Sequence, residues 1–363
     1  MAKYRIAWMP GDGIGKDVLD ATKIVLDRIK LDAEYIPADV GWEFWCKEGE
    51  PLPARTIDIM KETDCAMFGA ITSKPRTIAD KELIPQLQNK GYIYRSPIVR
   101  MRQLFDLFIC RRPCFAYPGN PLNYKEGIDF VMFRENTEDL YSGVEYYPVP
   151  EEMLKVKGME RVSRDAAISV KVNTPRGCRR IIEAAFDFAR QRKRRKVTCV
   201  HKANVVRATD GLFLEIFNEV SQSYPEIQPD EANVDSLCQW LLKRPHDYDV
   251  LVAPNLYGDI ISDLCAQMTG GLGFGSSGNI GSEYAVFEPT HGSAPKYAGM
   301  YKVNPIATIL AAKMMLEWLG ETESAEKIER AICRIIEEGH VRTYDMGGDA
   351  SSLQMAEAIA AKC

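Results

Sequence analysis

The sequence lacks the patterns that mark several large classes of protein. Its 363 residues contain no apolar run long enough to cross a bilayer, and they begin with a charged strand-like segment instead of an apolar signal segment. Lysine and arginine (46) do not outnumber aspartate and glutamate (51), so the basic excess of a nucleic-acid-binding protein is missing. The ten cysteines include no CxxC pair, and no histidine cluster accompanies them, which argues against a zinc site or a disulfide scaffold. We therefore expect a cytoplasmic protein without nucleic-acid or membrane partners.

A complete dinucleotide-binding fingerprint is also missing. Glycines 11, 13 and 15 lie in "MPGDGIGKDV", between a strand-like run and a helix-like run, but the GxGxxG pattern needs its third glycine where Lys16 stands. No acidic residue is obvious on a second strand about twenty residues later. The usual rule for a phosphate-binding loop is half met, so this loop alone does not establish a nucleotide site.

Apolar strand-like segments alternate with amphipathic helix-like segments along the chain. The strand-like segments are residues 4–8, 66–70, 129–133, 197–200 and 250–253. The helix-like segments are residues 17–29, 179–188 and 305–319. This alternation predicts an α/β protein, which we expect to contain two intimately joined domains. Residues 145–164 contain two prolines and a glycine and interrupt the pattern, which predicts a protruding arm or a long loop.

Several arginines lie among apolar residues, where an unpaired charge is costly. Spacing alone favours a surface position for Arg100 and leaves Arg102 and Arg112 open between a surface helix and a carboxylate-binding pocket. Arg134 directly follows a strand-like run and adds a third cation to that candidate pocket. Tyr141, seven residues later, is either a proton donor or a tyrosine satisfied by packing.

Two further stretches suggest chemistry at the ends of strands. Asp259 and Asp263 are four residues apart in "NLYGDIISDL", which puts both carboxylates on one helix face, where oxygen ligands suit Mg²⁺ or Mn²⁺. For Asp259, a favourable interaction with the helix dipole is an equally good explanation. Lys202 follows the strand-like residues 197–200 and is either a base with a lowered pKa or an ordinary lysine. The basic run at residues 192–196 is predicted to be a solvated helix end.

Glycine is dense in "GGLGFGSSGNIG" (270–281), and glycine, serine and proline are dense in the stretch that follows it. Such a segment either lets the backbone approach a ligand closely or forms an ordinary mobile loop. If a nucleotide binds there, His291, Lys296 and Tyr297 are available to its adenine and phosphates.

The motifs together resemble one family nearly from end to end. "PGDGIG", "RENTEDLYSG", "HKAN", "NLYGDIISDL" and "HGSAPKYAG" are similar to those of the β-decarboxylating hydroxyacid dehydrogenases that act on isocitrate, homoisocitrate, 3-isopropylmalate and tartrate or malate. The resemblance implies a two-domain isocitrate/isopropylmalate dehydrogenase-like α/β fold that is not a Rossmann fold. It also implies a large cofactor-binding domain of residues 1–106 and 270–363, and a small domain of residues 107–269 with the dimer interface and the arm.

The resemblance gives each matching residue a role in oxidative decarboxylation. The substrate would contact Ser96, Ile98, Arg102, Arg112, Arg134 and Asn204. Asp259 and Asp263 would hold Mg²⁺ or Mn²⁺ together with the partner subunit's Asp235, so a homodimer or a higher homo-oligomer with shared sites is implied. The partner subunit's Lys202 would assist deprotonation of the substrate hydroxyl, and Tyr141 would protonate the enolate after CO₂ leaves.

The same resemblance favours NADP over NAD. The cofactor would contact Thr72, His291, Gly292, Ser293, Ala294, Lys296, Tyr297, Asn304 and Tyr344. NAD-specific relatives typically carry Asp-Ile where this chain has Lys296 and Tyr297, and a lysine pairs with a 2′-phosphate. The further arginine of the NADP pattern is missing, with Gly348 near its place, so NAD stays the alternative.

Substrate choice is less well defined by the residues. Isocitrate enzymes usually have Ser-x-Asn here, but Ile98 stands in the asparagine position and would tolerate a branched alkyl group. Arg95 and Arg111 are extra cations expected near the pocket, which suits a third carboxylate. Isocitrate is therefore ranked first, homoisocitrate second and 3-isopropylmalate third. A non-catalytic regulatory subunit is a different class, but such subunits usually lose a metal ligand or the base, and here both are present.

Overall fold

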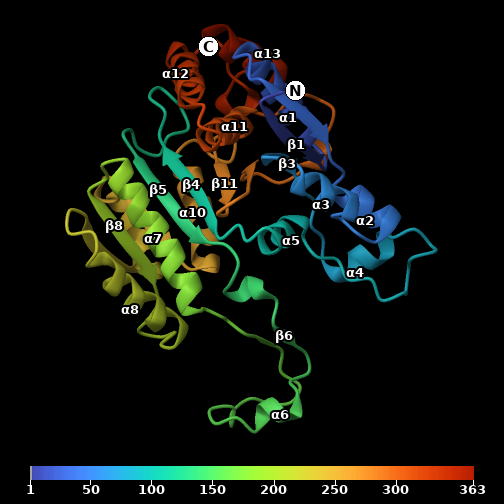
Figure 1. Ribbon diagram of the computed structural model, residues 1–363, viewed down its shortest axis with the longest axis vertical. Coiled ribbons are helices and arrows are strands. Elements are labelled where there is room, and N and C mark those ends of the chain that lie inside the picture. The colour runs from blue at the N-terminus through green and yellow to red at the C-terminus, as the bar shows by residue number, and fades with distance from the viewer. Residues whose placement is uncertain (1) are drawn as a thin grey trace.

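The computed structural model describes residues 2–363, in which helices cover both faces of a ten-stranded mixed sheet (Figure 1). The strands of this sheet are β1 (Tyr4–Gly11), β2 (Ala33–Pro37), β3 (Cys65–Ala70), β4 (Ile109–Phe115), β5 (Asp129–Glu135), β8 (Lys196–His201), β9 (Gln228–Asn233), β10 (Val250–Ala253), β11 (Ser276–Ile280) and β12 (Ala285–Pro289). The helices are α1 (Gly15–Arg28), α2 (Trp42–Glu48), α3 (Ala54–Lys61), α4 (Arg76–Ala79), α5 (Pro97–Leu104), α6 (Glu151–Leu154), α7 (Pro175–Gln191), α8 (Thr209–Ser221), α9 (Val234–Lys243), α10 (Asn255–Met268), α11 (Ile306–Trp318), α12 (Thr322–Glu338) and α13 (Ser352–Lys362).

The order of the strands is β2-β1-β3-β12-β11-β4-β5-β10-β8-β9. The first five come from residues 1–106 and 270–363, and the other five come from residues 107–269. Because β4 pairs antiparallel with both β11 and β5, the sheet is mixed and differs from the parallel sheet of a Rossmann fold, as predicted. The division into two domains stays a prediction, since the β11–β4 pairing joins both halves into one sheet.

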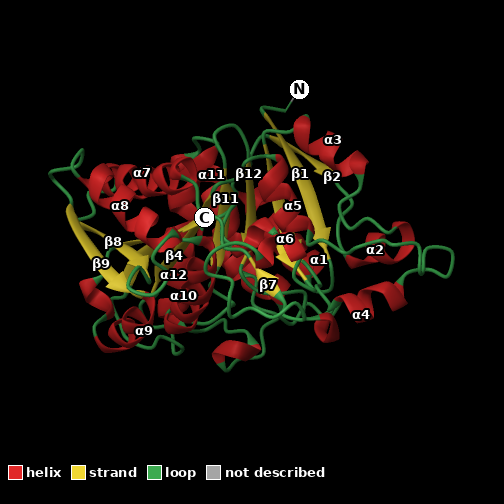
Figure 2. Cartoon of the chain, turned by 90° about the horizontal axis from the view of Figure 1, so that it is seen from below, coloured by secondary structure: helices red, strands yellow, loops and turns green. Residues whose placement is uncertain are grey.

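Successive residues of the strands point to opposite faces of the sheet, and each face has its own core. Val131 and Phe133 of β5 pack with α7 and α8, whereas Phe130 and Met132 pack with α9 and α10. Figure 2 shows α7 and α8 on one side of β8 and β9, with α9 and α10 on the other side. The α10 face carries the candidate active site described below.

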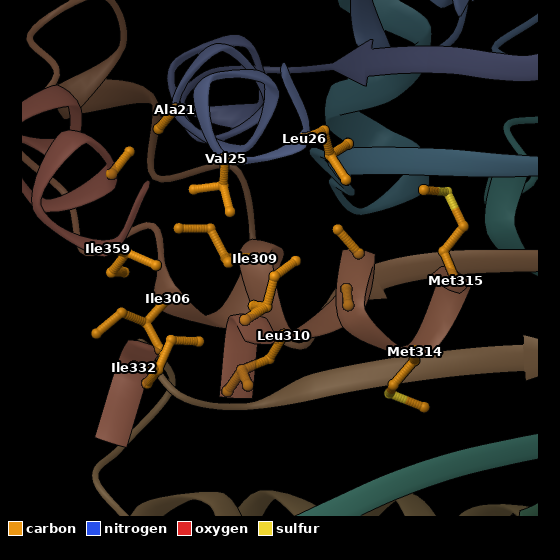
Figure 3. Close-up of a cluster of buried hydrophobic side chains, with 14 of the residues drawn as sticks. Ala21, Val25, Leu26, Ile306, Ile309, Leu310, Met314, Met315, Ile332 and Ile359 are labelled. Carbon is orange, nitrogen blue, oxygen red and sulfur yellow. The ribbon is translucent and has the colours of Figure 1, made fainter. Parts of the chain in front are cut away.

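The largest core lies between the two ends of the chain. Ala21, Val25 and Leu26 of α1 face Ile309 and Leu310 of α11 (Figure 3), and α12 and α13 pack against the same cluster. Helix α11 is buried on nearly all sides, which explains why residues 305–319 form such a strong apolar helical pattern in the sequence. Among residues 2–363, no helix combines the length and the apolar character that a membrane span requires.

The interruption predicted at residues 145–164 is confirmed as an arm. The arm extends to residue 169: it contains the short antiparallel strands β6 (Glu145–Tyr146) and β7 (Ile168–Ser169) with α6 between them, and it projects away from the body of the molecule (Figure 1). The aromatic side chain of Tyr147 on this arm is 78% exposed.

The prediction that residues 270–281 form a glycine-rich loop is wrong for the second half of this segment. Residues 276–280 form the central strand β11, which is buried between β12 and β4. A Cβ atom on Gly278 would lie 2.9 Å from the terminal methyl group of Met314 and 3.3 Å from the Phe287 ring, so glycine lets both side chains pack closely against β11. A strand buried on both faces has no alternation of polar and apolar residues to reveal it in the sequence.

Glu317 of α11 ties the two halves of the sheet together, and we expect its loss to lower stability. Its carboxylate accepts from Arg111 at 2.8 Å and from Arg192 at 3.2 Å. Burial raises the pKa of Glu317, but Arg111, Lys313 and Arg192 outweigh this effect, so its pKa lies below the ordinary 4.5. We expect Glu317→Gln to reduce the free energy of unfolding by about 2 kcal/mol at neutral pH.

The pH dependence of that difference follows from the direction of the shift. A carboxyl whose folded pKa is lowered stabilises the fold fully above its unfolded pKa, and this contribution is lost as the pH falls through the folded value. Urea unfolding of both proteins should therefore show a gap that is constant at neutral pH and narrows below about pH 4.5. A gap that is equally wide at pH 3 would contradict the ion-pair account.

Candidate active site

Three buried arginines from three different elements converge near the start of α10. Arg102 comes from α5, Arg112 from β4 and Arg134 from the end of β5, and their exposed fractions are 5%, 8% and 1%. The structure thus excludes the alternative that Arg102 and Arg112 lie on a surface helix. Arg112 and Arg134 face α10 because each occupies a strand position whose side chain points to that face of the sheet.

Asp259, in the first turns of α10, is the shared partner of this group. Its carboxylate accepts from Nη1 of Arg134 and from the hydroxyl of Tyr141, and Nη1 of Arg112 lies 3.4 Å from its Oδ1 atom. Burial raises the pKa of Asp259, but Arg134, Arg112 and the Tyr141 hydroxyl lower it by a larger amount. The pKa of Asp259 therefore lies below its ordinary value. Asp259 is therefore an anion at neutral pH.

Asp263, one helical turn later, faces the same point. Nη1 of Arg112 lies 3.1 Å from its Oδ1 atom, so one cationic nitrogen lies between the two carboxylates. Burial and the neighbouring Asp259 raise the pKa of Asp263, against the opposing effect of Arg112. Two facing carboxylates that share a cation, with 60% of the Asp263 side chain open to solvent, fit the oxygen ligands that Mg²⁺ and Mn²⁺ prefer.

One chain does not supply a full set of metal ligands. Within residues 2–363, no group of three or more His, Cys, Asp or Glu side chains is placed to hold a metal ion. A metal ion held by Asp259 and Asp263 would therefore need further ligands from outside this pair.

Tyr141 lies between the arginines and the carboxylates. Its hydroxyl donates to Oδ2 of Asp259, and its ring lies beneath the Arg134 guanidinium at 5.0 Å. Burial and the hydrogen bond to Asp259 raise the pKa of this phenol, so it carries its proton at neutral pH. A protonated phenol beside a group of cations is placed to donate a proton to a developing anion.

Lys202 belongs to a second cluster. Its ammonium donates to Asp235 at the start of α9, and its backbone N–H donates to the buried Asp210 at 2.7 Å. Asn204 lies exposed in the turn that begins at Lys202. Neither Lys202 nor Asp235 contacts the arginine and aspartate cluster of the same chain by any hydrogen bond or ion pair within residues 2–363.

Sequence reasoning missed three residues that hold the arginines in place. Asn255 accepts from both Nε and Nη2 of Arg134, at 2.9 and 2.7 Å. Asn279 accepts from Nε of Arg102 at 2.9 Å, and Glu288 lies 3.5 Å from that guanidinium. Asn255 lies two residues after the end of β10, at the start of α10, which was a usable signal, whereas Asn279 was hidden because its strand was interpreted as a loop.

The structure corrects one of the expectations near this site. Arg111 does not lie near the arginine pocket, because neighbouring residues of a strand point to opposite faces, and it pairs with Glu317 on the far side of the sheet. Ser96 is the N-cap residue of α5, and its hydroxyl forms no capping hydrogen bond with the residues of this helix. Ile98 is 8% exposed and packs in an apolar cluster. Arg100 pairs with Glu50.

Most of the predicted cofactor residues line one cavity of about 500 Å³. They are His291, Gly292, Ala294, Tyr297, Asn304 and Tyr344. Ser293 lies beside this cavity, and its hydroxyl contacts that of Thr72 at 2.6 Å. Asp12 of the "GDGIG" loop accepts from the backbone N–H groups of Thr72 and Trp42, so this loop organises the wall of the site.

Two lysines lie beside the rings of Tyr297 and Tyr344, which line this cavity. The rings of Tyr297 and Tyr344 lie 5.7 Å apart, and the Lys296 ammonium lies 4.7 Å from the Tyr297 ring. Sequence reasoning missed Lys302, whose ammonium lies 5.3 Å from the Tyr344 ring. Two ammonium groups and two phenols form a surface suited to a phosphate group.

Comparisons with known proteins find relatives that match almost the whole chain. A family model described as isocitrate/isopropylmalate dehydrogenase matches residues 5–361. The 3-isopropylmalate/3-methylmalate dehydrogenase of Methanocaldococcus jannaschii is 38% identical over 98% of both chains. The isocitrate/homoisocitrate dehydrogenase of Thermus thermophilus is 39% identical over 98% of this chain and 97% of its own.

Two further comparisons define the extent of the similarity. The crystal structure of isocitrate dehydrogenase from Methylococcus capsulatus superposes with a TM-score of 0.87 at 38% identity, covering 99% of both chains. Protein DlpA of Legionella pneumophila is 37% identical over 99% of this chain, which spans 58% of the length of DlpA.

Proposed function

Because the chain belongs to the isocitrate/isopropylmalate dehydrogenase family and is a decarboxylating dehydrogenase, we propose that it converts isocitrate to 2-oxoglutarate and CO₂ while reducing NADP. The observation that carries the proposal is the Asp259 carboxylate, which binds two of the three buried arginines and the Tyr141 phenol and shares Arg112 with Asp263. Homoisocitrate is the alternative substrate, followed by 3-isopropylmalate.

The arginines account for recognition of an acid with several carboxylates. Each guanidinium presents parallel N–H donors that match a carboxylate, and burial removes the competing water. The nitrogen atoms of Arg112 and Arg134 that now contact Asp259 would turn to the substrate when Asp259 and Asp263 bind a cation. The hydroxyl of Ser96, which forms no capping hydrogen bond, supports a further contact with a distal carboxylate.

Two residues would transfer protons during the reaction, one as a base and the other as an acid. Lys202 of the partner subunit would take up the proton of the substrate hydroxyl as hydride leaves for the nicotinamide, and Tyr141 would return a proton to the carbon that loses CO₂. A divalent ion held by Asp259, Asp263 and the partner subunit's Asp235 supplies, when bound, a Lewis acid that stabilises negative charge on the substrate oxygens. Lys202 donates to Asp235 within one chain, which supports the proposal that both residues contribute together to the active site of the partner subunit.

Steady-state turnover of the purified chain tests the function directly. The values of kcat/KM for isocitrate, homoisocitrate and 3-isopropylmalate, each measured with Mg²⁺ or Mn²⁺ and with NADP or NAD, rank the substrates by transition-state binding. We expect isocitrate with NADP to give the highest value. Absence of turnover with all three acids would reject the proposal and favour a regulatory subunit.

Replacing Lys296 with aspartate should move cofactor preference toward NAD. The change removes one of two ammonium groups beside Tyr297 and Tyr344 and adds a charge that repels a 2′-phosphate. We expect the ratio of kcat/KM for NADP to that for NAD to fall at least about tenfold, which corresponds to one charge-assisted hydrogen bond. Lys296→Gln is the matched control, which removes attraction without adding repulsion and should give a smaller change. An unchanged ratio in Lys296→Asp would contradict the phosphate-pairing account.

A further inference from the structure

A second charged cavity lies on the face of the sheet opposite the candidate active site. It is a groove of about 700 Å³ between α11 and α12 on one side and β4, β5 and the turn that joins α7 to β8 on the other. Arg111 lines this groove, whereas the next residue, Arg112, points through to the aspartates of α10. The groove and the arginine pocket thus lie on opposite faces of the sheet, at neighbouring residues of β4.

The groove has an excess of positive charge. Its walls carry six cationic side chains against four carboxylates. The cations are Arg111, Arg192, Lys193, Arg194, Arg195 and Lys313. The chain as a whole has a net charge of -5, so a local excess of cations runs against its overall composition.

The carboxylates are engaged by only part of this cationic set. Glu317 accepts from Arg111 and Arg192 and lies 3.4 Å from Lys313, and a second carboxylate, Glu329, lies 2.9 Å from Lys313. Arg194 pairs with Asp129 and Asp249, the other two carboxylates. The Nε atom of Arg111 is buried without a hydrogen-bond partner within residues 2–363.

The turn between α7 and β8 supplies the remaining charge. The prediction of a solvated helix end is confirmed in part for this basic run: the exposed Arg192 caps the C-terminus of α7, but Arg194 is half-buried and Lys196 begins β8. Lys193 and Arg195 are exposed and line the groove, and neither side chain forms an ion pair with a carboxylate within residues 2–363. Flexible side chains at the rim and fixed guanidiniums at the base are the components of a site for an anion with several charges.

We propose that this groove binds a small multivalent anion, either a polyphosphate group or a polycarboxylate. The anion would lie between the α7–β8 turn and α11, where it neutralises Arg192, Lys193 and Arg195 together. Because these elements belong to different halves of the sheet, the bound anion would link the two halves on the side away from the arginine pocket. Binding does not depend on turnover, so the proposal stands or falls independently of the proposed function.

Isothermal titration calorimetry without divalent metal tests the site, with inorganic pyrophosphate and propane-1,2,3-tricarboxylate as separate probes. The groove variant is Arg192→Gln/Lys193→Gln/Arg195→Gln, whose three side chains are exposed, so the chain should still fold, although loss of the Arg192–Glu317 ion pair should lower its Tm slightly. The matched control is Lys30→Gln/Lys81→Gln/Lys90→Gln, which removes the same charge from exposed positions outside the groove. Thermal unfolding without a probe checks that both variants are folded.

We expect the wild type and the control to bind at least one probe, and the groove variant to bind it at least tenfold more weakly. The probe that binds more tightly identifies the source of the charge as phosphate or carboxylate. A bound probe should also raise the Tm of the wild type and the control but not that of the groove variant. Equal affinity in the groove variant would place the probe at the arginine pocket and overturn the proposal, as would the absence of binding of both probes to the wild type.

Discussion

Asp259→Asn should lower kcat/KM by about a thousandfold or more, because a charge that both a cation and two arginines require is lost. The substitution preserves the shape of the side chain but leaves Arg134, which is 1% exposed, and Arg112 without their shared counter-charge. The same change should lower the free energy of unfolding by about 2–3 kcal/mol, less than for a fully buried pair, because a third of the Asp259 side chain is exposed. Steady-state kinetics and urea unfolding measure the two effects.

Asp263→Asn separates these two effects and serves as the matched control. The Asp263 side chain is 60% exposed and contacts Arg112 but not Arg134, so its loss should leave stability within about 0.5 kcal/mol of the wild type. Activity and Mn²⁺ affinity, measured by electron paramagnetic resonance, should fall in both variants. Retention of more than about a tenth of wild-type turnover by Asp259→Asn would be far outside the range for loss of a metal ligand and would contradict the assignment.

Lys202→Ala should lower kcat by about a hundredfold to ten-thousandfold, the usual range for loss of a general acid or base. Its side chain contacts Asp235 and not the arginine cluster of its own chain, so Mn²⁺ binding and Tm should change little. Lys202→Arg is the informative companion, because arginine keeps the ion pair with Asp235 but cannot give up its proton. Equal inactivity of the two variants points to proton transfer, whereas recovery in Lys202→Arg points to charge alone.

Mixing two inactive variants tests whether Lys202 acts in the neighbouring subunit. In a heterodimer of Lys202→Ala with Asp259→Asn, one site would carry both defects and the other would carry neither. Random reassociation in a symmetric dimer should therefore restore about one quarter of wild-type turnover. A mixture no more active than its two components would show that Lys202 and Asp259 serve the same chain.

The sequence was enough to identify several residues of the site, but not to predict the face of the sheet to which each side chain points. Arg134, Asp259 and Asp263 were identifiable because each follows a strand-like run or shares a helical face, and local patterns of this kind survive folding. Arg111 and Arg112 could not be separated, because "CRRP" was not recognised as a strand and only strand alternation sends the two side chains to opposite faces. Of these two neighbouring arginines, Arg112 therefore faces the arginine pocket and Arg111 faces the groove on the other side of the sheet.

The fold was predictable where a local pattern of residues, such as an amphipathic stripe or a run of turn residues, marks the element. Helix α7 and the arm were both anticipated, since an amphipathic stripe and a run of turn residues are visible in the sequence itself. Strand β11 was missed because Gly278 packs against Phe287 of the neighbouring strand β12 and against Met314 of α11, and no local pattern in the sequence reveals these contacts. The contact of Asn279 with Arg102 was not predicted for the same reason.

A crystal grown with Mn²⁺ and isocitrate tests the central claim most directly, because anomalous scattering locates the metal. We predict one strong peak at about 2.0–2.2 Å from oxygens of Asp259 and Asp263, with the guanidiniums of Arg102, Arg112 and Arg134 turned toward the carboxylates of the acid. A saturated crystal in which these two aspartates face away from the metal, or in which the acid binds apart from the three arginines, would contradict the account.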